Sequence, residues 1–192
     1  MVTLLAIGVA PARAQLSGQM HVKGGAGFLS FPDYLGLVLV GLGSIDTTEG
    51  VTRGEFIPLV GPSAELERVV SERFSWGGFF ALGCASAWTK FDSNGALNKR
   101  TSAIYPSLGI GCTTRYFRVG NFSMYGSWGL GVTFYAVDQY TASGGSTGVQ
   151  MAVFPTANLY PLSFKIGSQS GFYTEIGWGS KGFVSMGGFK YF

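Results

Sequence analysis

Long stretches of this sequence alternate between large apolar side chains and side chains that are small, polar or tyrosine. In residues 124–136 one face would carry Met124, Trp128, Leu130, Val132, Phe134 and Ala136, with Gly126 as the exception, and the other would carry Tyr125, Ser127, Gly129, Gly131, Thr133 and Tyr135. Residues 79–88, 104–112 and 172–178 repeat the pattern. A period of two indicates β-strands with two chemically different faces. The chain is therefore expected to be all-β.

The spacing of these stretches predicts eight strands. They lie at residues 19–28, 61–71, 76–90, 102–117, 122–139, 149–166, 171–179 and 183–192. The connections at 72–75, 118–121 and 167–170 are short, those at 29–60, 91–101 and 140–148 are longer, and 180–182 is a tight turn. An even strand number places both termini and the three short connections at one end. This layout is typical of bacterial outer-membrane barrels.

Composition points the same way. Charged residues make up only 12% of the chain, aromatic residues 15%, and there are 31 glycines. Beyond the first residues, the longest apolar run is 35–42, far shorter than the roughly 20 residues of a membrane-spanning helix. Only helices and closed barrels can cross a bilayer, because every backbone polar group needs an internal partner there. We therefore expect an eight-stranded antiparallel up-and-down transmembrane β-barrel, with small and polar side chains in its narrow interior.

A soluble lipocalin-like barrel is the competing fold, and it would turn the large apolar face inward around a ligand. Aromatic residues of that face, Trp88, Phe134 and Trp178, lie near both ends of the strands. Aromatic girdles at both membrane interfaces have this distribution. The membrane barrel is therefore favoured.

The amino end resembles a secretory signal. An apolar run at 2–10 is followed by Ala12, Arg13 and Ala14, which form an A-x-A-like cleavage site before Gln15. We expect residues 1–14 to be a signal peptide, without its basic first part, and residues 15–192 to be the barrel domain. The expected location is the bacterial outer membrane.

Gly177, Gly179 and Gly182 match the G-x-G-x-x-G spacing of dinucleotide-binding loops. That motif must open a helix within a βαβ unit and be followed by an acidic residue about 20 positions later. Only ten residues follow Gly182, and they alternate as a strand does. These glycines are therefore expected in a hairpin, and no cofactor is expected.

Catalytic and metal-binding patterns are not found in the sequence. The single histidine, His21, is expected near the periplasmic end of the first strand, opposite the rim where lipid-modifying barrel enzymes use histidine. One histidine and two scattered cysteines do not form a zinc-binding pattern. The net charge of +3, without basic runs, gives no indication of nucleic-acid binding. The protein is expected not to be an enzyme.

Cys84 and Cys112 are expected on the outward face of neighbouring strands. A connecting loop centred near Asn98 would bring them level, whereas one centred near Gly95 would offset them by about five residues, or ~16 Å. A disulfide requires Cα atoms within about 7 Å. Two lipid-facing thiols are slightly favoured, and a disulfide is left open.

Glu175 is expected to point into the lumen, and Arg115 and Lys165 are candidates for the same interior. Because buried charges pair, a bridge from Glu175 to Arg115 or Lys165 would plug the barrel. An open polar pathway around Glu175, Arg115 and Tyr135 is the alternative.

The connection at 29–60 is the longest irregular segment predicted. Long loops without secondary structure are usually functional or disordered, and this one carries an apolar run at 35–42. An exposed run of that size would mark a contact site, unless part of it extends a strand or enters the barrel mouth. The contact candidates are Phe31, Tyr34, Leu37 and Leu39.

The closing hairpin, Tyr173-Thr174-Glu175-Ile176-Gly177-Trp178-Gly179 to Phe189-Lys190-Tyr191-Phe192, resembles that of small outer-membrane β-barrel proteins of Bacteroides-type bacteria, OmpA- and OmpX-like barrels that are mostly uncharacterised. The resemblance implies that Phe192 is the signal read by the barrel-assembly machinery. Period two also turns Lys190 outward, where that signal prefers apolar residues. Either Lys190 reaches the interface or a bulge shifts the register.

The sequence thus predicts a non-enzymatic outer-membrane barrel with a structural or interaction role, surrounded by outer-membrane lipid. Residues 29–60 would contact a protein partner, with the chain acting as an accessory subunit of an envelope complex. The alternative function is a narrow pore or small-ligand carrier with a polar lumen. A lipid-modifying enzyme is disfavoured by the position of His21.

Overall fold

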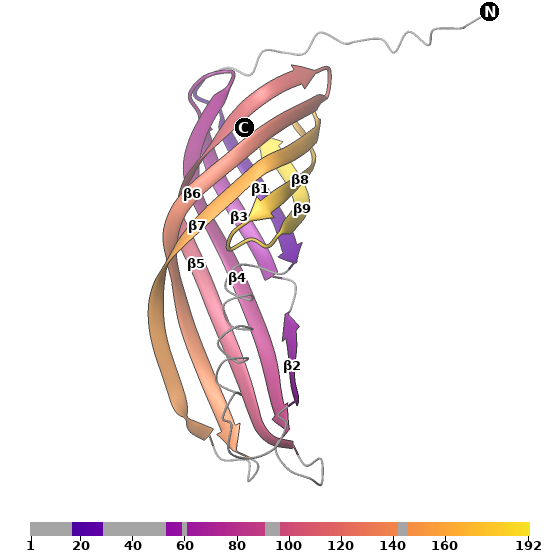
Figure 1. Ribbon diagram of the computed structural model, residues 1–192. Coiled ribbons are helices and arrows are strands. Elements are labelled where there is room, and N and C mark those ends of the chain that lie inside the picture. The colour runs from indigo at the N-terminus through magenta and orange to yellow at the C-terminus, as the bar shows by residue number, and fades with distance from the viewer. Residues whose placement is uncertain (1–16, 29–52, 59–60, 91–96, 142–145) are drawn as a thin grey trace, which may run out of the picture.

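The computed structural model describes residues 17–28, 53–58, 61–90, 97–141 and 146–192. Within them the chain forms nine β-strands (Figure 1): β1 Met20–Phe28, β2 Arg53–Pro58, β3 Gly61–Val69, β4 Phe74–Lys90, β5 Leu97–Val119, β6 Phe122–Thr141, β7 Ser146–Gly167, β8 Ser170–Trp178 and β9 Val184–Tyr191. These residues include no helix long and apolar enough to cross a membrane.

The strands form one closed antiparallel sheet. Around the wall the order is β1-β3-β4-β5-β6-β7-β8-β9, and β9 pairs back with β1. Successive wall strands are therefore neighbours in space, as in an up-and-down barrel. The predicted all-β barrel with eight wall positions is confirmed.

The second wall position is built from two segments. β3 pairs with the first part of β4, from Ser75 to Ala81, and β2 pairs with its last part, from Ala85 to Lys90. The sequence prediction that 29–60 is a loop throughout is therefore wrong for Arg53–Pro58, which extends the wall. The alternation in β2 is too short to be recognised, because six residues with a glycine and a proline carry little periodic signal.

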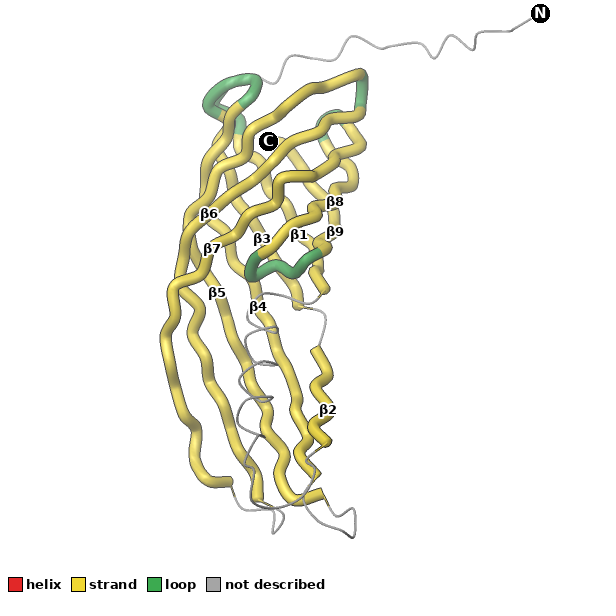
Figure 2. The backbone as a smooth tube through the Cα atoms, in the orientation of Figure 1, coloured by secondary structure: helices red, strands yellow, loops and turns green. Residues whose placement is uncertain are grey.

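The two sides of the barrel differ in height. β1, β8 and β9 have nine, nine and eight residues, whereas β4, β5, β6 and β7 have 17, 23, 20 and 22. The short turns β3–β4, β5–β6 and β7–β8 lie together near the carboxyl terminus (Figure 2), at what we call the short-turn end. The β8–β9 turn lies partway along the tall strands, which continue beyond it to what we call the far end.

Bulges in neighbouring strands explain the out-of-phase glycine of β6. The pairing shifts register at Tyr116 in β5 and at Pro161 in β7. The Tyr116 hydroxyl donates a hydrogen bond to the Pro161 carbonyl at 3.1 Å. A Cβ on Gly126 would lie 2.0 Å from that hydroxyl oxygen. Position 126 must therefore be glycine so that Tyr116 can cross β6.

The outer surface carries the large apolar side chains predicted for it. Trp128, Leu130 and Ile110 are 56%, 60% and 68% exposed. Charged side chains on this face lie near strand ends, as Arg68 and Lys190 do at the short-turn end. The interior is filled with polar residues, tyrosines and inward glycines. The glycines make room for large neighbours, since a Cβ on Gly83 would lie 1.9 Å from the Tyr105 ring.

Both cysteines are free thiols. Cys84 pairs in register with Ile104, and Cys112 pairs with Trp76, so the cysteines are offset by eight residues along their hairpin. This corresponds to roughly 26 Å along the strand, which excludes a disulfide.

Candidate functional site: the charged interior

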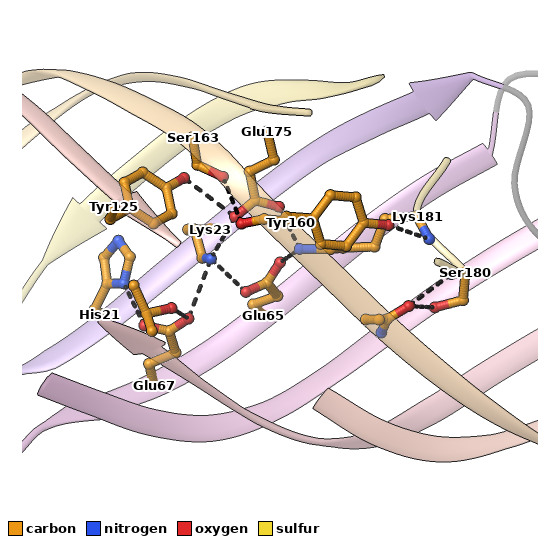
Figure 3. Close-up of polar contacts among 12 residues, drawn as sticks. His21, Lys23, Glu65, Glu67, Tyr125, Tyr160, Ser163, Glu175, Ser180 and Lys181 are labelled. Atoms are coloured by element: carbon orange, nitrogen blue, oxygen red, sulfur yellow. Dashed lines mark hydrogen bonds and ion pairs between the residues drawn. The ribbon is translucent and has the colours of Figure 1, made fainter. Parts of the chain in front are cut away.

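Six charged side chains and one histidine gather inside the half of the barrel next to the short-turn end. Three are lysines and three are glutamates: Lys23, Lys165, Lys181, Glu65, Glu67 and Glu175, with His21 beside them. All seven are at most 8% exposed. Figure 3 shows most of this interior cluster, with side chains converging from β1, β3, β8 and the β8–β9 turn.

Lys23 is the centre of the cluster. Its Nζ pairs with Glu65, with Glu67 Oε1 at 3.1 Å and with Glu175 Oε1 at 3.0 Å. Lys23 lies directly across from Glu65 in the β1–β3 ladder, as His21 does from Glu67. Because every second residue of these strands points inward, the β1–β3 ladder by itself brings Lys23 close to Glu65 and Glu67.

Glu67 is held by hydroxyl groups as well as by Lys23. Ser75 Oγ donates to Glu67 Oε2 at 2.5 Å, and Thr113 Oγ1 donates to Glu67 Oε1 at 2.8 Å. His21 Nδ1 lies 3.4 Å from Oε2. A carboxylate removed from water needs such partners to offset its desolvation. Glu67 thus links β1, β3, β4 and β5 across the lumen.

The β8–β9 turn closes this interior on the side that faces the far end. Lys181 pairs with Glu65 and Glu175, and its Nζ lies 4.4 Å from the Tyr160 ring centroid. Ser180 N donates to Asn158 Oδ1 at 2.6 Å, and Lys181 N donates to the Tyr160 hydroxyl at 3.2 Å. The predicted hairpin is confirmed, but its turn is folded into the lumen rather than exposed.

The three lumen candidates from sequence occupy different places. Glu175 is fully buried, and it pairs with Lys23 and Lys181 rather than with either cation expected from sequence. Its Oε1 also accepts a hydrogen bond from the Tyr125 hydroxyl at 3.1 Å. Lys165 lies inside, with Nζ 4.5 Å from the Tyr125 ring centroid. Arg115 lies at the short-turn end, where Nη1 donates to the Glu72 carbonyl at 2.8 Å.

His21 has no catalytic surroundings. It is 1% exposed, stacks on Tyr191 with ring centroids 4.4 Å apart, and meets Phe189 edge to face. Its Nε2 has no hydrogen-bond partner among the described residues. A group buried in this way offers no route to a substrate. The described part of the chain also contains no group of three or more His, Cys, Asp or Glu side chains placed to hold a metal ion.

Tyr135, proposed as part of an open pathway, stacks on Tyr105 with ring centroids 5.3 Å apart and meets Phe154 edge to face at 5.5 Å. The contact candidates Phe31, Tyr34, Leu37 and Leu39 lie outside the described residues, as does the expected signal peptide at 1–14.

Phe192 closes the barrel wall. Its backbone N donates to the Met20 carbonyl at 2.9 Å, and its side chain is exposed on the outer face. The β1–β9 and β8–β9 ladders run without a register shift. Lys190 therefore does point outward, and its Nζ lies 4.9 Å from the Phe192 ring centroid.

Sequence reasoning did not single out Lys23, Glu65, Glu67 or Lys181. The first three had a usable signal: His21-x-Lys23 and Glu65-x-Glu67 both alternate with apolar Val22 and Leu66. If the apolar face points outward, both polar pairs must point inward. Lys181 had no such signal, because a lysine in a tight turn is ordinarily in solvent.

Comparison with known proteins gives a remote likeness in fold. No protein-family model matches this sequence, and no curated protein is significantly similar to it. Among solved structures, the chain is similar to the crystal structure of Ail, the attachment invasion locus protein of Yersinia pestis, in complex with the heparin analogue sucrose octasulfate. The match covers 92% of this chain and 96% of that chain, at 12% identity and a TM-score of 0.48. A likeness at this level assigns neither ligand nor activity to the chain.

Proposed function

We propose that this chain is a non-enzymatic integral protein of the bacterial outer membrane, with a structural or interaction role. The observation that carries the proposal is the inversion of its two faces. Large apolar side chains such as Trp128 and Leu130 are exposed, while the charges of the interior cluster are buried. A soluble domain does not expose so much contiguous apolar surface, whereas a barrel in hydrocarbon must.

The distribution of aromatic residues supports a membrane position. Near the short-turn end the outer surface carries Phe117, Phe122, Phe164 and Phe172, with Phe122 ring centroids 5.9 and 5.8 Å from those of Phe117 and Phe164. Near the β8–β9 turn, Trp178 meets Phe183 edge to face at 4.6 Å. Two aromatic belts separated by apolar residues are typical of transmembrane barrels.

The interior favours a closed barrel over a diffusion pore. Three lysines and three glutamates balance in formal charge, and Glu65, Glu67 and Glu175 each contact at least one lysine. Such a cross-linked cluster resists the passage of hydrated ions.

An interaction role finds support at the far end. Among the described residues, β7 pairs with β8 only from Leu159 onward, so residues 149–158 have a ladder with β6 alone. Val149 to Pro155 are exposed at every position. An apolar strand edge of this kind can pair with a strand of another protein. We therefore extend the proposed contact region from residues 29–60 to this edge of β7.

Export and assembly complete the proposal. Removal of residues 1–14 would leave a mature chain starting at Gln15, which sequencing the amino terminus of the purified protein can test. Recognition by the barrel-assembly machinery through Phe192, kinship with Bacteroides-type barrels and a place as accessory subunit in an envelope complex are parts of the proposal that follow from the sequence.

The first experiment is fractionation of the cell envelope, followed by gel electrophoresis with and without boiling. We expect the protein in the outer-membrane fraction. Its mobility should change on heating, because a closed barrel stays folded in the gel detergent until the sample is boiled. Recovery from the soluble periplasm without detergent would contradict the proposal and direct the search to a ligand inside a soluble barrel.

A narrow pore or small-ligand carrier is the second candidate. Pockets of about 300 and 320 Å³, including solvent at their openings, lie on the two sides of Glu67 and its hydroxyl partners. If Glu67 and the hydroxyl groups that bind it moved apart, the two pockets would join into a polar path through the barrel. Conductance in a planar bilayer distinguishes the two functions.

A further inference from the structure

The pocket at the short-turn end has an excess of positive charge. It lies beside the β3–β4 turn and includes about 320 Å³ with the solvent at its opening. Its lining contains three cations, Arg73, Arg115 and Lys165, and one acid, Glu72. Of the interior cluster, Lys165 is the member that lines this pocket.

Lys165 faces this pocket without a carboxylate of its own. It is 5% exposed, and its Nζ lies 4.5, 5.6 and 5.8 Å from the ring centroids of Tyr125, Phe189 and Tyr191. None of the ion pairs among the described residues includes Lys165. Aromatic faces attract a cation but replace only part of its lost hydration.

The acids nearest to Lys165 are engaged elsewhere. Glu67 receives hydrogen bonds from Ser75 and Thr113 and an ion pair from Lys23. Glu175 is bound by Lys23 and Lys181. Lys165 therefore lines the pocket as a buried cation with no ion-pair partner among the described residues.

Arg115 is fixed at the same opening. Its Nη1 donates to the Glu72 carbonyl at 2.8 Å, and its backbone N donates to the Arg73 carbonyl at 2.7 Å. Both contacts anchor β5 to the β3–β4 turn and hold the guanidinium group beside the pocket. A fixed guanidinium group is suited to a planar or tetrahedral oxyanion.

We propose that this pocket binds a phosphoryl oxyanion, with Lys165 as the buried counter-charge and Arg115 at the opening. Two sources share this chemistry: free inorganic phosphate, and the phosphate of a lipid headgroup at the rim of the barrel. Binding of free phosphate goes beyond the proposed function and does not depend on it, whereas the lipid source rests on the proposed membrane location.

The first test uses the purified full-length barrel in a maltoside detergent, which contains no phosphate. Inorganic phosphate is titrated while the Lys165 side-chain amine is followed by NMR, with sodium chloride of equal ionic strength as the salt control. We expect a saturable shift with phosphate and not with chloride. This reading is made on the unaltered protein, so it does not depend on the folding of a variant.

Lys165→Met is the test variant, and Lys190→Met, at an outward lysine, is its matched control. Loss of a hydrogen-bonded charge should weaken phosphate binding about tenfold or more in Lys165→Met and leave Lys190→Met unchanged. Both variants should keep the heat-dependent gel mobility of the folded barrel.

The lipid source is tested by passing the barrel through vesicles of phosphatidylglycerol and counting, by native mass spectrometry, the lipids kept after return to detergent. One retained lipid that is absent from Lys165→Met, without a response to free phosphate, assigns the site to a headgroup. If neither phosphate nor lipid binds, or if both bind Lys165→Met as well as Lys190→Met, the proposal is wrong.

Discussion

Among the residues that the structure describes, Lys23 forms the most ion pairs, since its Nζ reaches Glu65, Glu67 and Glu175. Lys23→Met would leave Glu65 and Glu175 to share Lys181 and would remove the lysine that pairs with Glu67. Removing one partner of a buried ion pair costs about 3–5 kcal/mol. The barrel is placed in lipid vesicles, and its unfolding in urea is measured by the change in gel mobility. We expect Lys23→Met to unfold at a markedly lower urea concentration than the unaltered protein.

Lys190→Met is the control for that change, because Lys190 lies on the outer face next to Phe192. It should unfold within about 0.5 kcal/mol of the unaltered protein, as most surface substitutions do. Equal unfolding of the two variants would contradict the central role given to Lys23.

Phe192 tests assembly at the same scale. Phe192→Ala should lower the amount of heat-modifiable protein in the outer membrane and raise the amount of unfolded protein in the periplasm, because the proposed recognition signal is lost. Phe172→Ala removes an equally outward phenylalanine, 77% exposed, from the neighbouring strand. Immunoblots of both fractions compare the two. A matching loss in Phe172→Ala would assign the effect to stability rather than to recognition.

The sequence could predict the orientation of a single residue only where apolar and polar side chains alternate regularly. Glu175 could be placed in the lumen, because Thr174 and Ile176 flank it in a regular strand. Its partners could not be predicted, since Lys23 lies 152 residues away in the sequence and the turn that carries Lys181 is held inside by the hydrogen bonds of Ser180 to Asn158 and of Lys181 to Tyr160. Pairing across a closed wall depends on register and shear, which local periodicity does not contain.

At the scale of strands, β6 and β7 test where the membrane lies. Leu130 is on the outer face of β6, level with Ile110 and Ala157 in the neighbouring strands. Val153 is on the outer face of β7, six positions beyond Leu159, the last partner of β8. Leu130→Arg should destabilise the barrel more than Val153→Arg, because a charge on the lipid face costs about 2–4 kcal/mol at the bilayer midplane and only about 0–1 kcal/mol near the interfaces. Unfolding in lipid vesicles measures both.

The reverse order, with Val153→Arg the more damaging, would show that lipid covers the far end of β7 as well. The same edge can be tested for partners. Met151→Lys, on a residue that is 82% exposed, places a charge on the free edge of β7. It should reduce crosslinking to neighbouring envelope proteins without lowering the stability of the barrel.

Strand positions were predicted well where alternation is long, as in β4 to β7. β2 was missed because its six residues pair only with the end of β4, and a long-range contact of this kind leaves no local pattern. The bulge that carries Tyr116 across Gly126 was visible from the sequence only as one glycine out of phase.

At the scale of the whole molecule, the closed interior predicts that the barrel does not conduct ions. The unaltered protein in a planar bilayer should give no sustained conductance, because the interior cluster and the β8–β9 turn fill the lumen. Steady openings would instead favour the narrow pore. The folded state is confirmed in the same sample by its gel mobility before heating.

The unequal height of the wall has a mechanical consequence for its surroundings. Nine residues of β8 at a tilt of about 40° span ~23 Å, close to the ~25 Å apolar band of outer-membrane barrels. On β7, outward apolar residues continue from Val149 to Ile166, nearly twice that length. In a bilayer of even thickness the additional length of β7 extends beyond the hydrocarbon, and the barrel is expected to tilt so that more of this apolar surface enters lipid.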